Sequence, residues 1–173
     1  MSYTQIDLFS FSVFIAAIIA LIRYDKICPE YYPFIFCMWV ASLNEIFSYF
    51  IVKCGYTTAV NNSVYNVLEM LLITWQFRRW GLFYTRNTFY SCAFVVIIIA
   101  WVMENSGNRL IATIGAWFHV AFILAIIFKS IDFITQSIVD NYGRLLRNSI
   151  FLISLGYVCF FSFEMLTEVY TLF

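Results

Sequence analysis

Charged residues are scarce in this sequence: Asp, Glu, Lys and Arg make up 12% of its 173 residues, whereas hydrophobic residues make up 63%. A soluble globular domain contains about 25% charged residues, so the surface of a soluble protein with this composition would be too apolar to stay in water. The mean hydropathy is +0.85. The composition therefore excludes a soluble or disordered chain and predicts an integral membrane protein.

The sequence also lacks an excess of positive charge and any motif of paired cysteines. Its ten basic and ten acidic residues cancel, whereas a nucleic-acid-binding protein needs a basic face to neutralise phosphates. The five cysteines form no C-x-x-C motif and are odd in number, so neither a disulfide framework nor a zinc site is indicated. We expect no nucleic-acid partner, no metal and no cofactor.

Long apolar runs, by contrast, are abundant. A helix needs about 20 mainly apolar residues to cross the hydrocarbon core of a bilayer. Six such runs, separated by charged residues, proline or glycine, lie at about residues 7–22, 34–52, 60–77, 88–103, 110–128 and 149–170. The connections are too short for a soluble domain, so we predict an all-α fold in which residues 1–173 form one transmembrane domain, a bundle of six membrane-spanning helices.

Basic residues are distributed unevenly among the predicted connections. The first, third and fifth connections contain eight Lys and Arg residues, whereas the second and fourth contain only Lys53 and Arg109. Short basic connections stay on the cytoplasmic side of a membrane. With six spans, this bias predicts that both termini lie outside the cytoplasm.

Several polar side chains fall within the predicted spans, where they are costly and are therefore candidates for function. The third span is the richest, and its polar residues share one helical face: Asn62, Asn66, Glu69 and Gln76. Buried Asn and Gln commonly hydrogen-bond between helices, so a packing role is favoured for the amides. The carboxyl groups point to function, because Gln would serve packing equally well without titrating.

The carboxyl groups and the single histidine of four spans lie at depths that converge in the outer half of the predicted bundle. On its own, a central histidine such as His119 is more typical of packing than of a site. The residues that we expect to contact a ligand, an ion or a proton are Asn44, Glu45, Asn66, Glu69, His119 and Glu164.

This polar set is compatible with three classes of function. We favour a non-enzymatic membrane sensor or accessory subunit, whose buried carboxyl groups respond to a ligand, an ion or a proton. The alternative is a small ion or proton channel, or a pore-forming effector such as those of phage defence. A membrane-embedded metal-dependent enzyme is third, because the motifs H-E-x-x-H, E-x-x-H and G-x-S-x-G are all missing.

The connection before the last span is expected to extend the fifth helix over about residues 129–142. It has an apolar face and an opposite polar face, and Gly143 is a suitable stop. We expect a cytoplasmic amphipathic helix that lies on the membrane or docks a cytosolic partner through Asp132, Gln136 and Asp140. Because so little of the chain lies outside the bilayer, we also expect a homo-oligomer or a partner protein.

Three stretches resemble a group of small uncharacterised bacterial multi-pass inner-membrane proteins. They are S-L-N-E-I-F-S-Y-F-I-V-K at 42–53, N-N-S-V-Y-N-V-L-E-M-L-L at 61–72 and W-Q-F-R-R-W-G-L-F at 75–83. The group shares an N-[DE] pair on the second helix and Y-x-x-L-E on the third, which here fall on Asn44, Glu45, Tyr65, Leu68 and Glu69. The resemblance implies a bacterial inner-membrane location and a paired role for the two polar elements, and it implies no activity.

Overall fold

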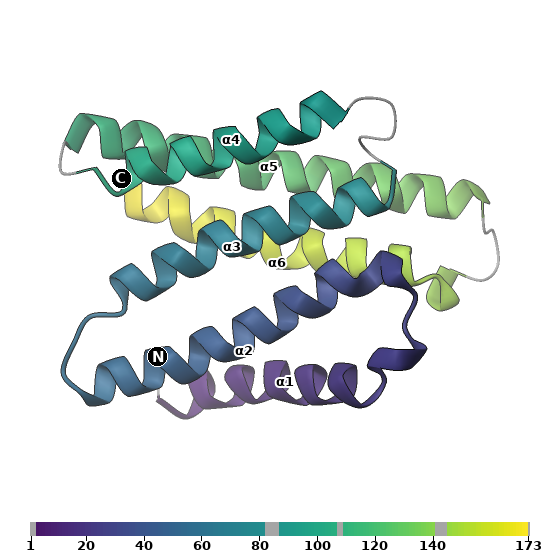
Figure 1. The fold of residues 1–173 in the computed structure, drawn as a ribbon, viewed down its shortest axis with the longest axis horizontal. Helices are drawn as coiled ribbons and strands as arrows, with labels where there is room; N and C mark the ends of the chain where they lie inside the picture. The colour runs from purple at the N-terminus through teal and green to yellow at the C-terminus, as the bar shows by residue number, and fades with distance from the viewer. Residues whose placement is uncertain (1–2, 82–86, 107–108, 141–144, 173) are drawn as a thin grey trace. The chain divides into compact units, whose positions relative to one another are not determined.

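The computed structural model describes the backbone of residues 3–81, 87–106, 109–140 and 145–172, and the side chains of residues 13–81, 90–106, 110–139 and 145–170. This part of the chain consists of helices joined by short irregular connections and contains no strands (Figure 1). The α-helices are α1 (Tyr3–Ile22), α2 (Tyr32–Lys53), α3 (Ala59–Arg79), α4 (Asn87–Glu104), α5 (Arg109–Asp140) and α6 (Ser149–Leu172), with short 3₁₀ helices η1 (Tyr24–Lys26), η2 (Pro29–Tyr31) and η3 (Leu145–Arg147). Each predicted span falls within one of the α-helices.

The ends of the helices follow from local sequence. Pro33 lies in the first turn of α2, where the N–H that proline lacks has no partner within the helix. After α2 and α3, Gly55 and Gly81 adopt φ angles of 81° and 96°, a left-handed conformation that glycine reaches without steric cost. At the start of α6 the Asn148 side chain accepts a hydrogen bond from the N–H of Ile150 at 3.0 Å.

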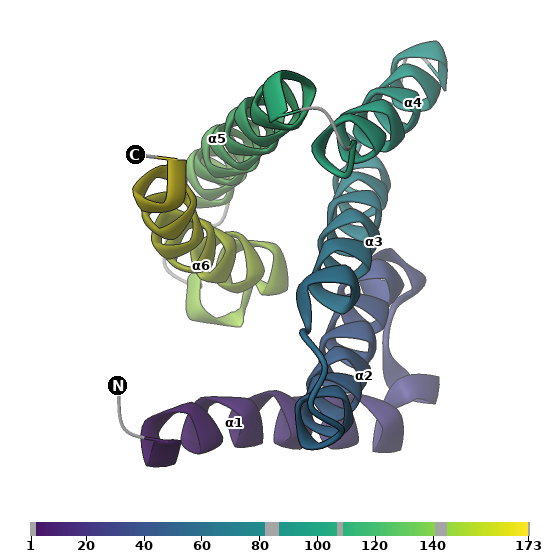
Figure 2. The same ribbon diagram turned by 90° about the vertical axis from the view of Figure 1, so that its left-hand side faces the viewer.

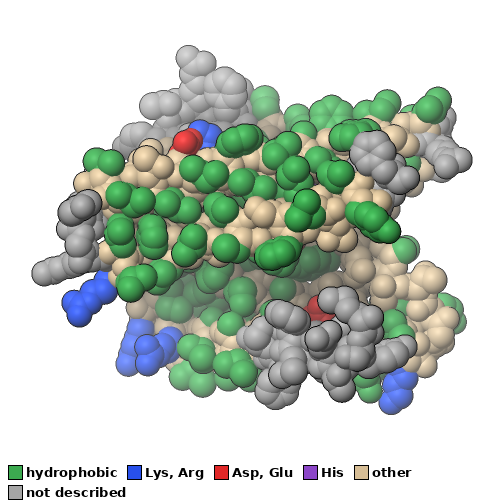
Figure 3. Space-filling view, turned by 180° about the vertical axis from the view of Figure 1, so that it is seen from behind, with side chains coloured by type: hydrophobic (Ala, Val, Ile, Leu, Met, Phe, Trp, Pro, Cys, Tyr) green, Lys and Arg blue, Asp and Glu red, His purple; other side chains and the backbone are tan. Residues whose placement is uncertain are grey.

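Three helices in the described ranges are long and apolar enough to cross a membrane, and these are Pro29–Lys53, Leu110–Val139 and Ser149–Tyr170. Val13–Ile22 and Tyr90–Glu104 are shorter apolar segments. Many large hydrophobic side chains are exposed on the surface, where they appear as green atoms in Figure 3. Such a surface suits hydrocarbon rather than water, and the chain is a helical membrane protein.

The predicted transmembrane domain contains two compact units. Unit 1, Met1–Trp101, holds α1, α2, α3 and most of α4, and unit 2, Val102–Phe173, holds the end of α4 together with α5 and α6. In unit 1 the helices α2 and α3 run antiparallel and side by side, and in unit 2 the same is true of α5 and α6 (Figures 1 and 2).

Side chains join α1 to α2 and α3 to α4 in unit 1. The indole N–H of Trp39 in α2 donates to the Ala17 carbonyl in α1 at 3.2 Å. The indole N–H of Trp101 near the end of α4 donates to the Ser63 hydroxyl near the start of α3 at 2.8 Å. At the other end of this pair, the Arg78 guanidinium lies 4.2 Å from the centre of the Tyr90 ring. The α3–α4 pair is therefore antiparallel and fastened at both ends.

Unit 2 is organised around a seam between α5 and α6, which we define by the buried side chains of the two helices. Most of them recur at steps of three, four or seven residues, and they are His119, Val120, Ile123, Ile126, Ser130 and Ser137 in α5, and Ser154, Tyr157 and Phe161 in α6. This spacing is that of helices packed at a shallow angle. The helix α5 continues beyond the predicted span to Asp140, whereas the predicted stop at Gly143 lies outside the described residues.

Candidate functional site

The predicted site residues belong to two units. Asn44, Glu45, Asn66 and Glu69 lie in unit 1, and His119 and Glu164 lie in unit 2. Each unit places these residues beside further polar groups that sequence reasoning did not select.

Glu69 is the buried carboxyl group among the described side chains of unit 1, with 6% of its surface exposed. The Tyr65 hydroxyl, one turn earlier in α3, donates to Glu69 Oε1 at 3.0 Å. The thiol of Cys37 in α2 is also buried and lies close enough for the charge of Glu69 to act on it. No cation pairs with Glu69 among the described side chains. The carboxyl group therefore lies between two helices with hydroxyl and thiol neighbours.

Burial increases along the polar face of α3. Asn62 is exposed, Asn66 is half-buried, and Glu69 and Gln76 are buried. The predicted common face therefore enters the interior of unit 1 only from its middle onward. This gradient separates Glu69 from the amides that precede it.

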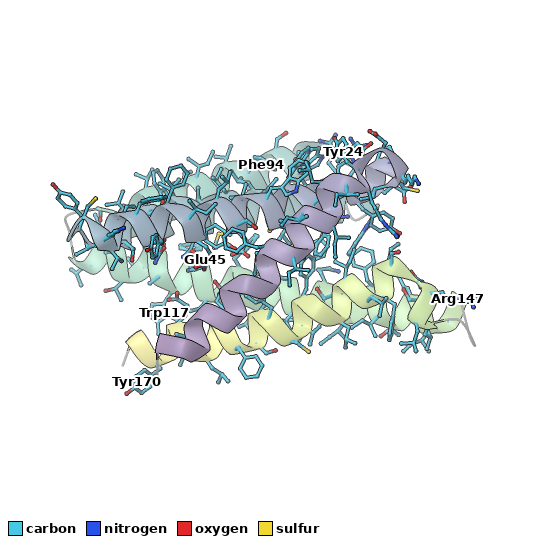
Figure 4. All side chains as sticks on the ribbon, turned by 90° about the horizontal axis from the view of Figure 1, so that it is seen from below. Tyr24, Glu45, Phe94, Trp117, Arg147 and Tyr170 are labelled. Atoms are coloured by element: carbon cyan, nitrogen blue, oxygen red, sulfur yellow. The ribbon has the colours of Figure 1, made fainter. Side chains whose placement is uncertain are left out.

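Glu45 has a different environment from Glu69. It lies near the middle of α2 and is exposed, whereas the preceding Asn44 is half-buried (Figure 4). Consecutive residues of a helix are rotated by about 100°, so the two side chains of the N-E pair face different surroundings. The buried face of α2 carries Asn44 and not Glu45.

Asn44 takes part in a bridge between α2 and α3 that we call the Asn61 bridge. The Asn61 side-chain amide donates to Asn44 Oδ1 at 2.7 Å and to the Ser48 hydroxyl at 2.9 Å. Sequence reasoning missed Asn61, although a signal was present: Asn61, Tyr65 and Glu69 recur at steps of four residues. Hydrogen bonding explains the polar character of Asn44 without a ligand.

Gln76 forms a second bridge, the Gln76 bridge, at the other end of the α2–α3 pair. Its side chain is fully buried. Its Oε1 accepts a hydrogen bond from the N–H of Phe34 at 2.9 Å, and its Nε2 donates to the Glu30 carbonyl at 2.7 Å. The first N–H groups of a helix have no partner within it, so Gln76 satisfies one of these groups of α2 from the neighbouring helix.

Unit 2 gathers titratable groups from three helices. His119 of α5 is 5% exposed, and its Nδ1 has no hydrogen-bond partner among the described residues. Glu164 and Glu168 continue the three- and four-residue spacing of the α6 seam. Glu104, at the end of α4, lies within electrostatic range of both His119 and Glu168. Imidazole and carboxyl groups thus lie near one another in this unit.

Gly115 explains how Glu104 reaches this cluster. A Cβ atom at Gly115 would lie 2.5 Å from the backbone nitrogen of Glu104, so the end of α4 approaches α5 closely at this position. His119 lies one turn further along α5. Sequence reasoning missed Glu104 because the predicted span ended one residue before it. A carboxyl group at the boundary of a span is expected to be solvated.

The predicted docking face lies on the second half of α5. Asp132 and Gln136 are exposed, and the Asp132 carboxylate pairs with Lys129 Nζ at 2.9 Å. The side chain of Asp140 lies outside the described residues. An exposed ion pair of this kind adds little stability.

Carboxyl, hydroxyl and imidazole groups such as these are able to bind protons or polar ligands. Within the described residues, no three His, Cys, Asp or Glu side chains are arranged to hold a metal ion. Apolar surroundings make the charged form of a carboxyl group costly. Comparisons of the chain with family models, with curated proteins and with solved structures found no match.

Proposed function

We propose that this chain is a non-enzymatic membrane sensor or accessory subunit whose response depends on the buried carboxyl group of Glu69. In this proposal it crosses the bacterial inner membrane six times and has both termini outside the cytoplasm. The uneven distribution of Lys and Arg supports the orientation, and the resemblance on residues 42–83 supports the location. The small mass outside the bilayer favours action as a homo-oligomer or beside a partner protein.

The observation that carries this proposal is the environment of Glu69. The group is buried, and its hydrogen-bond partner among the described residues is the Tyr65 hydroxyl rather than a cation. An ionised carboxylate buried without a cation is strongly unfavourable, whereas the protonated form is tolerated and also becomes a hydrogen-bond donor. Protonation or the arrival of a cation therefore changes the interactions available to Glu69.

A change in the charge of Glu69 alters the packing of α2 against α3. Glu69 lies on the buried face of α3, close to Cys37 of α2. A neutral carboxyl group and a charged one differ in the neighbours that they accept, so the two forms favour different packing of this pair. A partner protein that contacts either helix would then respond to the state of Glu69.

The test compares Glu69→Gln with Glu45→Gln in protein reconstituted into lipid nanodiscs. Both substitutions remove one carboxyl group, but Glu45 is exposed whereas Glu69 is buried. We measure protection factors, which are exchange rates relative to the intrinsic amide rate at the same pH, and expect those of α2 and α3 to change with pH in the wild type and in Glu45→Gln but not in Glu69→Gln. Protection factors that are independent of pH in the wild type, or a pH response that persists in Glu69→Gln, would contradict the proposal.

A flux measurement in liposomes separates sensing from conduction. A sensor passes no protons or ions at any pH, so wild type and Glu69→Gln should give the same background leak. Flux in the wild type that Glu69→Gln abolishes would replace the sensor with a channel.

A further inference from the structure

One end of unit 1 gathers four basic side chains that come from separate parts of the sequence. Arg23 and Lys26 lie in the turn between α1 and α2, and Arg78 and Arg79 lie at the end of α3, and all four are exposed. The Gln76 bridge ties the end of α3 to the start of α2. The two basic pairs are therefore brought to the same end of the unit, on the right-hand side in Figure 1.

Aromatic rings connect these two basic pairs, and we call them the aromatic ladder. Tyr24 stacks on Tyr32 with 4.9 Å between ring centres and lies 5.7 Å from Trp39. Phe36 lies 5.6 Å from Trp39 and stacks on Trp75 at 5.9 Å. The ladder runs from the turn after α1, across α2, to α3, and Tyr24, its first residue, is labelled in Figure 4.

The two arginines of α3 rest on ring faces at this end. The Arg79 guanidinium lies 5.8 Å from the centre of the Trp75 ring, and that of Arg78 lies 4.2 Å from the centre of the Tyr90 ring. A guanidinium over a ring is attracted by the π face, while its N–H groups project from the edge of the planar group. These contacts orient the two guanidinium groups at this end of unit 1.

Two acidic side chains, Asp25 and Glu30, are exposed near the same turn. Four basic groups outnumber them, and Arg23, Lys26 and Arg79 form no salt bridge with any described side chain. The charge at this end of unit 1 is therefore positive and incompletely neutralised by the protein.

We propose that this end of unit 1 is a binding site for the headgroup of an anionic phospholipid, with Arg78 and Arg79 contacting its phosphate. Trp and Tyr favour the headgroup level of a bilayer, where an amphipathic ring meets both hydrocarbon and water. Arginine binds phosphate oxygens through two parallel hydrogen bonds, and clustered basic residues beside a membrane helix attract anionic lipid. Arg23 and Lys26 add positive charge around the headgroup, and a lipid with no net charge satisfies this site less well.

The site is tested by native mass spectrometry of the protein released from nanodiscs that contain equal amounts of phosphatidylglycerol and phosphatidylcholine. We expect the wild type to retain phosphatidylglycerol in preference to phosphatidylcholine. In the double variant Arg78→Gln/Arg79→Gln this preference should fall about thirtyfold, the loss expected for two basic groups near an anionic surface. A wild type without any preference would overturn the proposal.

Lys53→Gln is the matched control. Lys53 lies at the opposite end of α2 and also contacts a ring, with its Nζ 5.9 Å from the centre of Tyr49. It should retain the preference, and so should Glu69→Gln, which separates this test from that of the sensor. An equal loss in Lys53→Gln would show attraction by charge alone and would refute a site.

Arg79→Lys keeps the protein's charge and provides a test if the double variant fails to fold. Lysine cannot form the paired hydrogen bonds of a guanidinium, so we expect a partial loss of the preference for phosphatidylglycerol. An unchanged preference in Arg79→Lys would overturn the role assigned to this arginine.

Discussion

The two units of this chain use different means to hold helices together. In unit 1 the amide groups of Asn61 and Gln76 bridge α2 and α3 with hydrogen bonds. In unit 2 small side chains, among them Ser130 and Ser154, lie fully buried on the seam between α5 and α6. Apolar side chains gain little from meeting each other in lipid, so packing distance and polar contacts decide which helices associate.

Each unit combines its means of helix packing with a group of carboxyl side chains or a single buried one. Amide bridges at both ends of the α2–α3 pair fix its alignment, and Glu69 lies between them along α3. Small residues on the α5–α6 seam permit close packing, and Glu104, His119 and Glu168 lie near one another in the same unit. Polar bonding in unit 1 and close approach in unit 2 can be broken separately.

The largest effect is expected from the Gln76 bridge. Gln76→Ala removes a fully buried side chain and leaves the part-buried Phe34 N–H and Glu30 carbonyl without their partner, and an unsatisfied polar group costs up to about 1–3 kcal/mol. The free energy of unfolding should fall by about 2–4 kcal/mol, measured by titration with sodium dodecyl sulfate in mixed micelles. Gln136→Ala, an exposed position in unit 2, should change it by less than about 0.5 kcal/mol. Equal effects of Gln76→Ala and Gln136→Ala on the free energy of unfolding would contradict a stabilising role of the Gln76 bridge.

Gly115 provides the corresponding test of close approach in unit 2. A Cβ atom there would lie 2.5 Å from Glu104 N and 2.8 Å from Glu104 Cα, and backbone atoms cannot rotate away. Gly115→Ala should therefore lower the free energy of unfolding by about 1–3 kcal/mol and increase hydrogen exchange at the end of α4. Gly156→Ala meets no atom within 4 Å and should raise stability by about 0.5–1 kcal/mol through helix propensity. A neutral result at Gly115 would refute the close approach.

The smallest effect is expected from a pair of alanine substitutions, one in each unit. Asn61→Ala removes the bridge to Asn44 and Ser48 and should cost about 1 kcal/mol, since hydrogen bonds between membrane helices average about 0.6 kcal/mol. Ser154 is buried, and its hydroxyl has no partner among the described residues, so Ser154→Ala loses no hydrogen bond. Its effect should stay within about 0.5 kcal/mol of zero, measured by the same titration. A larger loss of stability in Ser154→Ala than in Asn61→Ala would contradict the proposal that hydrogen bonds hold unit 1 together and close packing holds unit 2 together.

Helix positions were predictable because they depend on local properties. Each predicted span lies within an observed helix, since hydropathy and the placement of charge, proline and glycine act along one segment. Three helices are confirmed as long and apolar enough to cross a membrane. The polar α3 has too little hydropathy for that criterion, and its crossing belongs to the proposed six-span topology.

The candidate site was predictable only where helical periodicity applied. The common face of Glu69 and Gln76 followed from their spacing, whereas the exposure of Glu45 depends on the rotation of α2 about its axis. The position of Glu104 near His119 depends on the close contact between the end of α4 and α5 at Gly115. Spacing within one helix cannot reveal these relations.

The sequence alone determined that this chain is a helical membrane protein, because partition into hydrocarbon depends on composition and on the length of apolar runs. Tertiary structure decided which polar groups are buried and which groups they meet. It paired Asn61 with Asn44 and Ser48, Gln76 with the backbone of Glu30 and Phe34, and Glu69 with Cys37. The physical reason is that contacts between helices depend on rotation and alignment, which arise from packing over the whole length of both partners.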